Sequence, residues 1–381
     1  MSRCHISVIK LSYCIRPTKW QLITTLDIGK TMIIRHAFIF CVLLLIPNIL
    51  LAGVVTTDGS DVVVNIKGPI DIKTSDGKYS AKLGGRIQWD YNYSELNGVA
   101  DEDDFDIRRA RLYLSGHVND WSYKVQFNVG NNIGGTHEDL YIRYNGWGKK
   151  AVVTIGSQKE PFGLEQLESS KDISYLERSA VTEAYAPGRR EGILFSGQRD
   201  DITYALGVFE DDGVDDGTAV TGRVTYAPIK SANQVLHLGV AHSNRDADVD
   251  ITGIEVAYTR GPYHIQSEFI SSEENDVNRE GLYVQAGWII TGETRPYKNG
   301  VFKRIKPGNS SGAWELVLRY EDGDGAYSDE ELGSTDATSY GAGVNYYLNQ
   351  FIRIGATFTE AKDNINGDDG SEFRARIQIA L

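Results

Sequence analysis

The stretch YSAKLGGRIQWDYNY, residues 79–93, decides the fold class of this chain. Its odd-numbered positions carry Tyr, Ala, Leu, Gly, Ile and Trp, whereas its even-numbered positions carry Ser, Lys, Gly, Arg, Gln, Asp and Asn. A period of two residues indicates a β-strand with one apolar and one polar face. The segment WSYKVQFNV, residues 121–129, repeats the pattern, so a strand period and not a helical one organises this part of the chain.

Segments of this kind recur to the C-terminus, and we count sixteen of them. An even number is expected when antiparallel strands close into a transmembrane barrel. The segments cover residues 79–93, 105–118, 121–129, 136–145, 150–156, 190–198, 200–210, 218–228, 234–243, 250–260, 262–272, 279–290, 312–321, 337–348, 350–360 and 371–381.

The connections between these segments alternate in length. Short turns such as 119–120 and 260–262 alternate with longer loops that are acidic or rich in glycine. We expect these long loops at residues 95–104, 131–135, 157–189, 211–217, 244–249, 273–278, 322–336 and 361–370. Such alternation, with aromatic residues near the strand ends, is typical of an outer-membrane barrel. Only 291–311 breaks the rule, because it is long where a short turn is due.

A soluble β-sandwich is the alternative fold, since antiparallel soluble sheets also alternate apolar and polar residues. Sixteen strands exceed what one sandwich normally holds, and Tyr and Trp gather near the strand ends on the apolar faces. We therefore predict an all-β fold, a transmembrane antiparallel β-barrel of sixteen strands over residues 79–381. A barrel of this size encloses an aqueous lumen.

The N-terminal region predicts export. Arg35 and His36 precede the apolar run 37–46, and small residues follow up to Ala52, which is the pattern of a secretory signal peptide. We assign 32–52 to the signal peptide, 1–31 to a non-native upstream extension and 53–78 to a short periplasmic lead-in. All 3 Cys and both Met precede residue 42, which excludes disulfides and thiolate metal sites from the rest of the chain.

The polar faces predict a basic lumen although the whole chain has a net charge of -13. Net acidity argues against binding nucleic acid, and the excess acid lies in the predicted loops, for example at 101–104 and 368–369. Charges in a low-dielectric wall focus their own field, so a basic wall favours anions. The alternative is that the wall bases are solvated and paired with wall acids. The inward bases are Lys82, Arg86, Arg108, Arg109, Arg111, Lys124, Arg143, Arg223, Arg319, Arg353, Arg374 and Arg376, and the inward acids are Asp90, Asp106, Asp139, Glu255, Glu268 and Glu315.

The run Arg108-Arg109-Ala110-Arg111 carries the densest basic signal. Phe105 before it and Leu112 after it give opposite parities for the apolar face. We expect one β-bulge between residues 108 and 111, which can turn more than one arginine inward. Guanidinium groups fork onto oxyanions.

These features resemble the phosphate-selective porin O and P family, from about Asp71 to the C-terminus. The resemblance rests on ordered motifs at 83–88 (LGGRIQ), 108–111 (RRAR), 159–163 (KEPFG), 177–179 (ERS), 187–190 (PGRR), 291–295 (TGETR) and 312–315 (GAWE). It implies a trimeric outer-membrane channel whose third long loop, 157–189, folds inward to form an anion-binding constriction. It also implies an elaborated segment at 291–311.

The resemblance implies roles for individual residues at the constriction. Arg108 and Arg109 resemble its strand arginines and Lys159 its loop-base lysine. Asp139 resembles an acid that tempers the positive field, and Arg178 either joins the constriction or anchors the loop. With the lumen bases, the expected solute-binding set is Arg108, Arg109, Arg111, Lys159, Arg178, Asp139, Arg86, Lys124 and Arg143.

The function expected from these features is passive conduction of small anions, phosphate or related oxyanions among them, across the bacterial outer membrane. We expect no enzyme, because the histidines after residue 52 are scattered without a Ser/His/acid motif. We expect no cofactor and no metal. The expected partners are small anions, outer-membrane lipid and lipopolysaccharide, and two further copies of the chain. A non-selective or other-solute porin and a structural or adhesive barrel remain the alternatives.

Overall fold

The computed structural model describes residues 54–57, 60–66, 68–130, 137–211, 217–246, 248–275, 277–324, 336–365 and 367–381. The predicted upstream extension and signal peptide, residues 1–52, lie outside the described residues. Among the described helices, none has the length and apolarity needed to cross a membrane.

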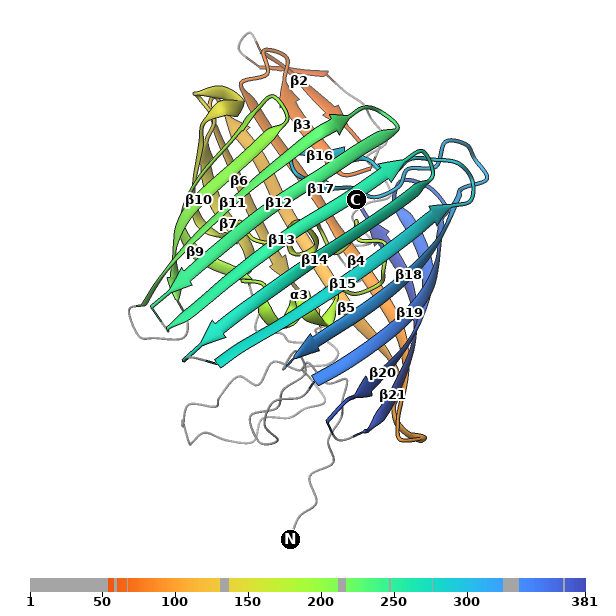
Figure 1. The fold of residues 1–381 in the computed structure, drawn as a ribbon. Coiled ribbons are helices and arrows are strands. Elements are labelled where there is room, and N and C mark those ends of the chain that lie inside the picture. The colour runs from red at the N-terminus through yellow and green to blue at the C-terminus, as the bar shows by residue number, and fades with distance from the viewer. Residues whose placement is uncertain are drawn as a thin grey trace, which may run out of the picture.

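Sixteen antiparallel strands form one closed barrel, as predicted (Figure 1). Each predicted segment corresponds to one of them, and β21 closes the barrel by pairing with β4, from Gly370↔Leu96 to Ala380↔Arg86. The barrel strands are β4 (Tyr79–Leu96), β5 (Val99–Val118), β6 (Trp121–Asn128), β7 (His137–Tyr144), β8 (Val152–Lys159), β9 (Arg189–Arg199), β10 (Ile202–Asp211), β11 (Gly217–Lys230), β12 (Gln234–Arg245), β13 (Val249–Arg260), β14 (Tyr263–Glu274), β15 (Val277–Ile289), β18 (Ala313–Asp324), β19 (Asp336–Tyr347), β20 (Ile352–Asp363) and β21 (Asp369–Ala380).

The two faces of each strand differ in burial as the sequence alternation requires. On β4, Ile87 and Trp89 point outward and are 46% and 56% exposed, whereas Gln88 and Asp90 between them are fully buried. Closure pairs the backbone groups of every barrel strand with a neighbour on each side, which a strand in lipid needs. The polar face is therefore the inner surface of the barrel.

The predicted long loop at 95–104 is wrong, because β4 and β5 continue through it and meet at a tight turn of Asn97 and Gly98. Both residues have positive φ, 52° and 74°, the conformation that an Asn-Gly hairpin favours. The acidic residues 101–104 thus belong to a long hairpin instead of a loop. The predicted loops 244–249 and 273–278 are shortened in the same way, since β12 ends at Arg245 and β14 at Glu274.

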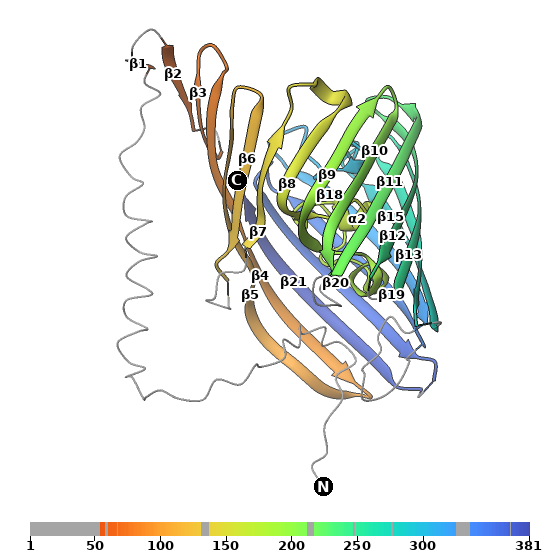
Figure 2. The same cartoon turned by 90° about the vertical axis from the view of Figure 1, so that its left-hand side faces the viewer.

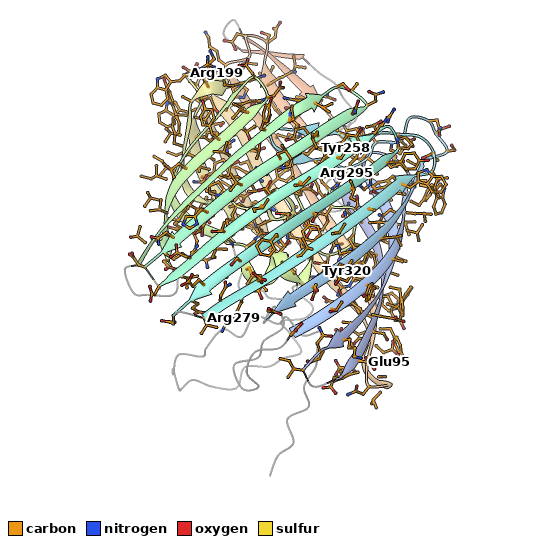
Figure 3. All side chains as sticks on the ribbon, in the orientation of Figure 1. Glu95, Arg199, Tyr258, Arg279, Arg295 and Tyr320 are labelled. Carbon is orange, nitrogen blue, oxygen red and sulfur yellow. The ribbon has the colours of Figure 1, made fainter. Side chains whose placement is uncertain are left out.

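The lead-in is a small sheet that extends β4. Its strands β1 (Val54–Thr57), β2 (Ser60–Asn65) and β3 (Ile70–Thr74) pair antiparallel in order. β3 pairs with the start of β4, from Ile70↔Leu83 to Lys73↔Ser80, on the edge that β21 leaves free. Figure 2 shows these strands at the end of the barrel opposite the tip of the β4–β5 hairpin. In Figure 3, Glu95 lies at that tip and Arg199 at the other end.

Two connecting segments pack against inward-facing side chains of the wall. Segment 160–188 carries the short helices α2 (Leu164–Leu167) and α3 (Ala180–Tyr185), and segment 290–312 carries the hairpin β16 (Tyr297–Lys298) and β17 (Val301–Phe302). A short 3-10 helix, η1 (Gly148–Lys150), joins β7 to β8. The buried apolar clusters combine segment and barrel-strand residues: Phe162 packs with Ile270 of β14, and Leu164 and Phe302 pack with Ala257 of β13. Packing on the inner wall therefore holds both segments.

Candidate functional site

One cavity of about 520 Å³ lies between the inner wall and segment 160–188. Seven of the nine predicted site residues line it: Arg86, Arg111, Lys124, Asp139, Arg143, Lys159 and Arg178. Lys171, Arg189 and Lys303 also line it and were not predicted. The lining therefore contains nine basic side chains and one acidic side chain.

Two adjacent carboxylates balance part of this charge. Lys124 Nζ lies 2.5 Å from Asp139 Oδ2, and Arg189 Nε lies 2.7 Å from Asp139 Oδ1. Glu138 pairs with Arg111 and, at 2.9 Å, with Arg189. Neighbouring residues of a regular strand face opposite sides, so the prediction that Asp139 points inward implies that Glu138 points outward. A register shift between Val125↔Leu140 and Phe127↔His137 marks a bulge at these two acids, which lets both face the lumen.

The other cations of the cavity have mainly neutral partners. Arg86 Nη1 donates to Ser169 Oγ at 2.9 Å, and Arg143 Nε donates to Thr154 Oγ1 at 3.0 Å. Lys159 Nζ donates to the carbonyl oxygens of Gln166 and Glu168. The guanidinium groups of Arg86 and Arg143 therefore keep a positive charge in the cavity with hydroxyl groups as their hydrogen-bond acceptors.

The segment adds two further cations to the same space. Arg178 donates to the carbonyl oxygens of Glu165 and Glu168, at 3.0 and 2.9 Å, and pairs with Glu183 at 3.1 Å. Burial lowers the pKa of Lys171 to about 8, against the opposing charge of Asp172. Lys171 is therefore mostly charged at neutral pH and loses its charge within the range in which proteins are commonly studied.

Arg108 and Arg109 stand apart from this cavity. Arg109 forks onto Glu177, with distances of 2.7 and 2.8 Å to the two carboxylate oxygens, and Arg108 Nη2 lies 3.2 Å from Oε2. The bulge that turns both arginines inward lies at residues 107–108, opposite Trp89, and overlaps the predicted interval 108–111 only at residue 108. Burial alone would raise the pKa of the Glu177 carboxyl, but the guanidinium groups of Arg109, Arg376 and Arg108 hold it well below its usual range.

The remaining inner wall is filled with ion pairs that sequence reasoning largely missed. Segment 160–188 supplies a glutamate to each of three buried arginines. The pairs are Glu160 with Arg245, Glu165 with Arg319, and Glu168 with Arg295. Of these three arginines only Arg319 was predicted to face the lumen, and its partner is a buried loop glutamate instead of a wall acid. The partners come from a loop whose orientation no alternation reveals, so the sequence carries no local signal for the pairing.

Strand residues form a further pair beside them. Arg223 Nη2 lies 2.6 Å from Glu255 Oε2, and His237 Nε2 lies 2.9 Å from the same oxygen. Arg295, which Figure 3 labels, donates hydrogen bonds to the side chains of Gln266 and Glu168. In the described part of the chain, no group of three or more His, Cys, Asp or Glu is arranged to hold a metal ion.

Comparison with known proteins gives concordant matches. The family model for "Phosphate-selective porin O and P" matches residues 81–253 and 245–380. The chain is 30% identical to Porin O of Pseudomonas aeruginosa over 418 aligned residues, which cover 87% of this chain and 95% of that protein.

Solved structures share the barrel fold at lower identity. An anion-selective porin from Comamonas acidovorans superposes with a TM-score of 0.58 at 13% identity, covering 80% of this chain and 100% of that one. OmpT of Vibrio cholerae in its trimer form gives a TM-score of 0.54 at 12% identity, covering 80% and 99%.

Proposed function

Because this chain belongs to the phosphate-selective porin O and P family of bacterial outer-membrane porins, we propose that it forms a water-filled channel that conducts small anions in preference to cations. Phosphate and related oxyanions are the preferred solutes. The observation that carries this proposal is the cavity of about 520 Å³ with nine basic side chains and one acidic side chain in its lining.

The mechanism is passive. An anion entering the lumen exchanges part of its water for the N–H donors of Arg86, Lys171 and their neighbours. Charge-assisted hydrogen bonds to oxyanions are short and strong, and a planar guanidinium can bind two oxygens at once. Several moderate sites in series let the anion hop onward, whereas one tight site would trap it.

We infer that segment 160–188 narrows the lumen at this cavity. Its contacts with the wall are distributed around the barrel, which supports this. Ser170 O accepts from Gln88 on β4, Ile173 O accepts from Arg353 on β20, and Glu160 accepts from Thr221 on β11. A segment tied to strands so far apart in the barrel order crosses the lumen. The cavity that it leaves along β4 to β9 is then the route for solutes.

The assembly and export of the channel complete the proposal. We propose a homotrimer, in line with the trimer form of OmpT, embedded in outer-membrane lipid and lipopolysaccharide. Export uses the signal peptide assigned to 32–52. N-terminal sequencing of the mature protein tests the cleavage after Ala52, and a chain beginning at Met1 would contradict it.

The test of anion preference is a planar-bilayer recording on the purified protein. In a KCl gradient we expect the reversal potential to move toward the chloride equilibrium potential, and we expect added phosphate to inhibit the chloride current. The double variant Arg86→Gln, Lys159→Gln removes two basic side chains that have neutral partners, so phosphate inhibition should weaken more than tenfold. Arg199→Gln, at the exposed end of β9, is the matched control and should behave as the native protein.

Two results would separate the alternatives. A reversal potential on the cation side contradicts the anion channel. Weak selectivity that phosphate does not change points to a non-selective porin, and absence of conductance points to a structural barrel.

A further inference from the structure

Four arginines from two strands converge on one loop carboxylate. Arg108 and Arg109 on β5 contact Glu177 as described, and Arg374 Nη1 on β21 lies 3.3 Å from Glu177 Oε1. Arg376, also on β21, donates to the same oxygen. β21 and β5 are the two neighbours of β4 in the barrel, so the cluster sits across three adjacent strands.

The four arginines of the cluster face three carboxylates, Glu177, Asp90 and Glu372, so each carboxylate is needed to offset their charge. Arg376 also forks onto Asp90, with distances of 2.6 and 2.5 Å, and Arg374 also pairs with Glu372 at 3.0 Å. In the described structure, the ion pairs of Arg108 and Arg109 are those with Glu177. Removing this carboxylate would leave two adjacent guanidinium groups without an anionic partner.

The geometry is that of oxyanion binding. Parallel N–H donors of Arg109 meet both oxygens of one carboxylate, which is how arginine recognises a free carboxylate or phosphate. Here the anion is attached to the chain. A tethered group competes at a high effective concentration, so a dissolved anion at ordinary concentration cannot replace it.

We propose that Arg108, Arg109, Arg374 and Arg376 form an oxyanion-binding site that the chain's own Glu177 carboxylate occupies. Glu177 thereby excludes solute anions from this site and locks segment 160–188 to β5 and β21. Solute anions therefore bind in the neighbouring cavity around Arg86 and Lys171. Glu177 is a positioning residue for conduction, and only this consequence for transport rests on the proposed anion channel.

Backbone contacts keep the site in shape without the side chain. Arg376 Nη1 donates to Leu176 O at 2.5 Å, and Arg319 Nη1 donates to Glu177 O at 3.0 Å. Access also exists, because the Glu177 side chain is 20% exposed and that of Arg108 is 42% exposed. A variant that lacks the carboxylate should therefore hold an open, basic pocket that a small carboxylate ion can enter.

Chemical rescue tests the proposal. Thermal unfolding is measured for purified native protein, Glu177→Ala and Glu183→Ala in chloride, with sodium acetate or neutral acetamide added. We expect Glu177→Ala to lose about 5–10 °C in Tm and to regain most of it with acetate in a saturable manner, but not with acetamide. Native protein and Glu183→Ala, which removes a carboxylate of the same segment that pairs with one arginine, should not respond to acetate.

Glu177→Gln keeps the side-chain volume and covers the case in which the alanine variant does not assemble. We expect a similar loss of Tm, because an amide cannot balance the guanidinium charges. Native-like stability of Glu177→Gln, or an equal acetate effect in native protein and Glu177→Ala, would overturn the proposal. Thermal unfolding does not depend on ion flow. A result that contradicts the Glu177 site is therefore distinguishable from one that contradicts the proposed anion channel.

Discussion

Arg86 and Arg319 both point inward from the wall of one barrel, yet they lie in contrasting regions. On the cavity side, Arg86 donates to a serine hydroxyl and keeps its charge uncompensated. In the region of buried ion pairs, here called the paired side, Arg319 contacts Glu165 and, at 3.4 Å, Glu321. Its guanidinium group lies 4.4 Å from the centre of the Tyr175 ring. The comparison teaches that the nearby counter-charge, and not the residue type, separates a solute-binding arginine from a structural one.

The two regions differ because segment 160–188 presents different groups to each. Toward the paired side it directs the carboxylates of Glu160, Glu165 and Glu168. Toward the cavity it directs backbone carbonyl oxygens and the serine hydroxyl that meets Arg86. Neutral acceptors orient a cation without cancelling its field, so the cavity stays attractive to anions.

The largest expected difference between the regions concerns stability. Arg319→Met leaves Glu165 and Glu321 buried without their cation, which should cost about 3–5 kcal/mol of unfolding free energy. Arg86→Met on the cavity side removes a cation that has no carboxylate partner, so it should cost less than about 1 kcal/mol. Urea unfolding followed by tryptophan fluorescence measures both. Equal losses would contradict the distinction.

The effect of pH on anion binding in the cavity should be smaller, and Lys171 should contribute to it. Its pKa of about 8 means that the side chain is charged below this pH and neutral above it. Inhibition of the chloride current by sulfate, which does not titrate in this range, should therefore weaken severalfold between about pH 7 and 9. Lys171→Met should reduce this pH dependence. A native channel with a flat profile would show that Lys171 does not contribute to binding.

A smaller change is expected when the acidic residue inside the cavity, Asp139, is neutralised. Asp139 pairs with Lys124 and Arg189 inside the cavity, as glutamates do on the paired side. Asp139→Asn frees both cations at nearly constant volume, so the anion-to-cation permeability ratio should rise about twofold. Reversal potentials of the two proteins in the same gradient give the ratio. A lower ratio in the variant would contradict the role assigned to Asp139.

The smallest effect should come from the acidic β4–β5 hairpin. Asp103→Asn with Asp104→Asn removes two exposed charges far from the cavity lining. Anion conductance should rise slightly at about 0.01 M salt, where the Debye length is about 30 Å, and should not change at about 1 M, where it is about 3 Å. A salt-independent increase would mean that the hairpin acts by contact instead of through its field.

Strand alternation predicted the barrel well because lipid and water impose opposite requirements on its two faces. The same parity placed Arg86, Arg111, Lys124 and Arg143 on the inner surface, where the cavity brings them together. It failed at the bulge that turns Glu138 inward.

The other errors have distinct physical causes. Acidic composition suggested a loop at 95–104, but the Asn97-Gly98 turn continues the strands there. Glu177 could not be placed, because the position of a loop carboxylate depends on tertiary contacts that no local period encodes. The family resemblance implies that Arg108 and Arg109 lie at the constriction, which stays a prediction; the structure places both against Glu177 of segment 160–188.

The most direct test compares two single variants that each lose one positive charge, Arg86→Gln in the cavity and Arg108→Gln in the Glu177 cluster. Phosphate is titrated against the chloride current of each in planar bilayers. We predict that Arg86→Gln raises the half-inhibitory phosphate concentration about tenfold, whereas Arg108→Gln stays within about twofold of the native protein, since its cluster is already occupied. A tenfold rise in Arg108→Gln with no change in Arg86→Gln would contradict the assignment of the anion route to the cavity.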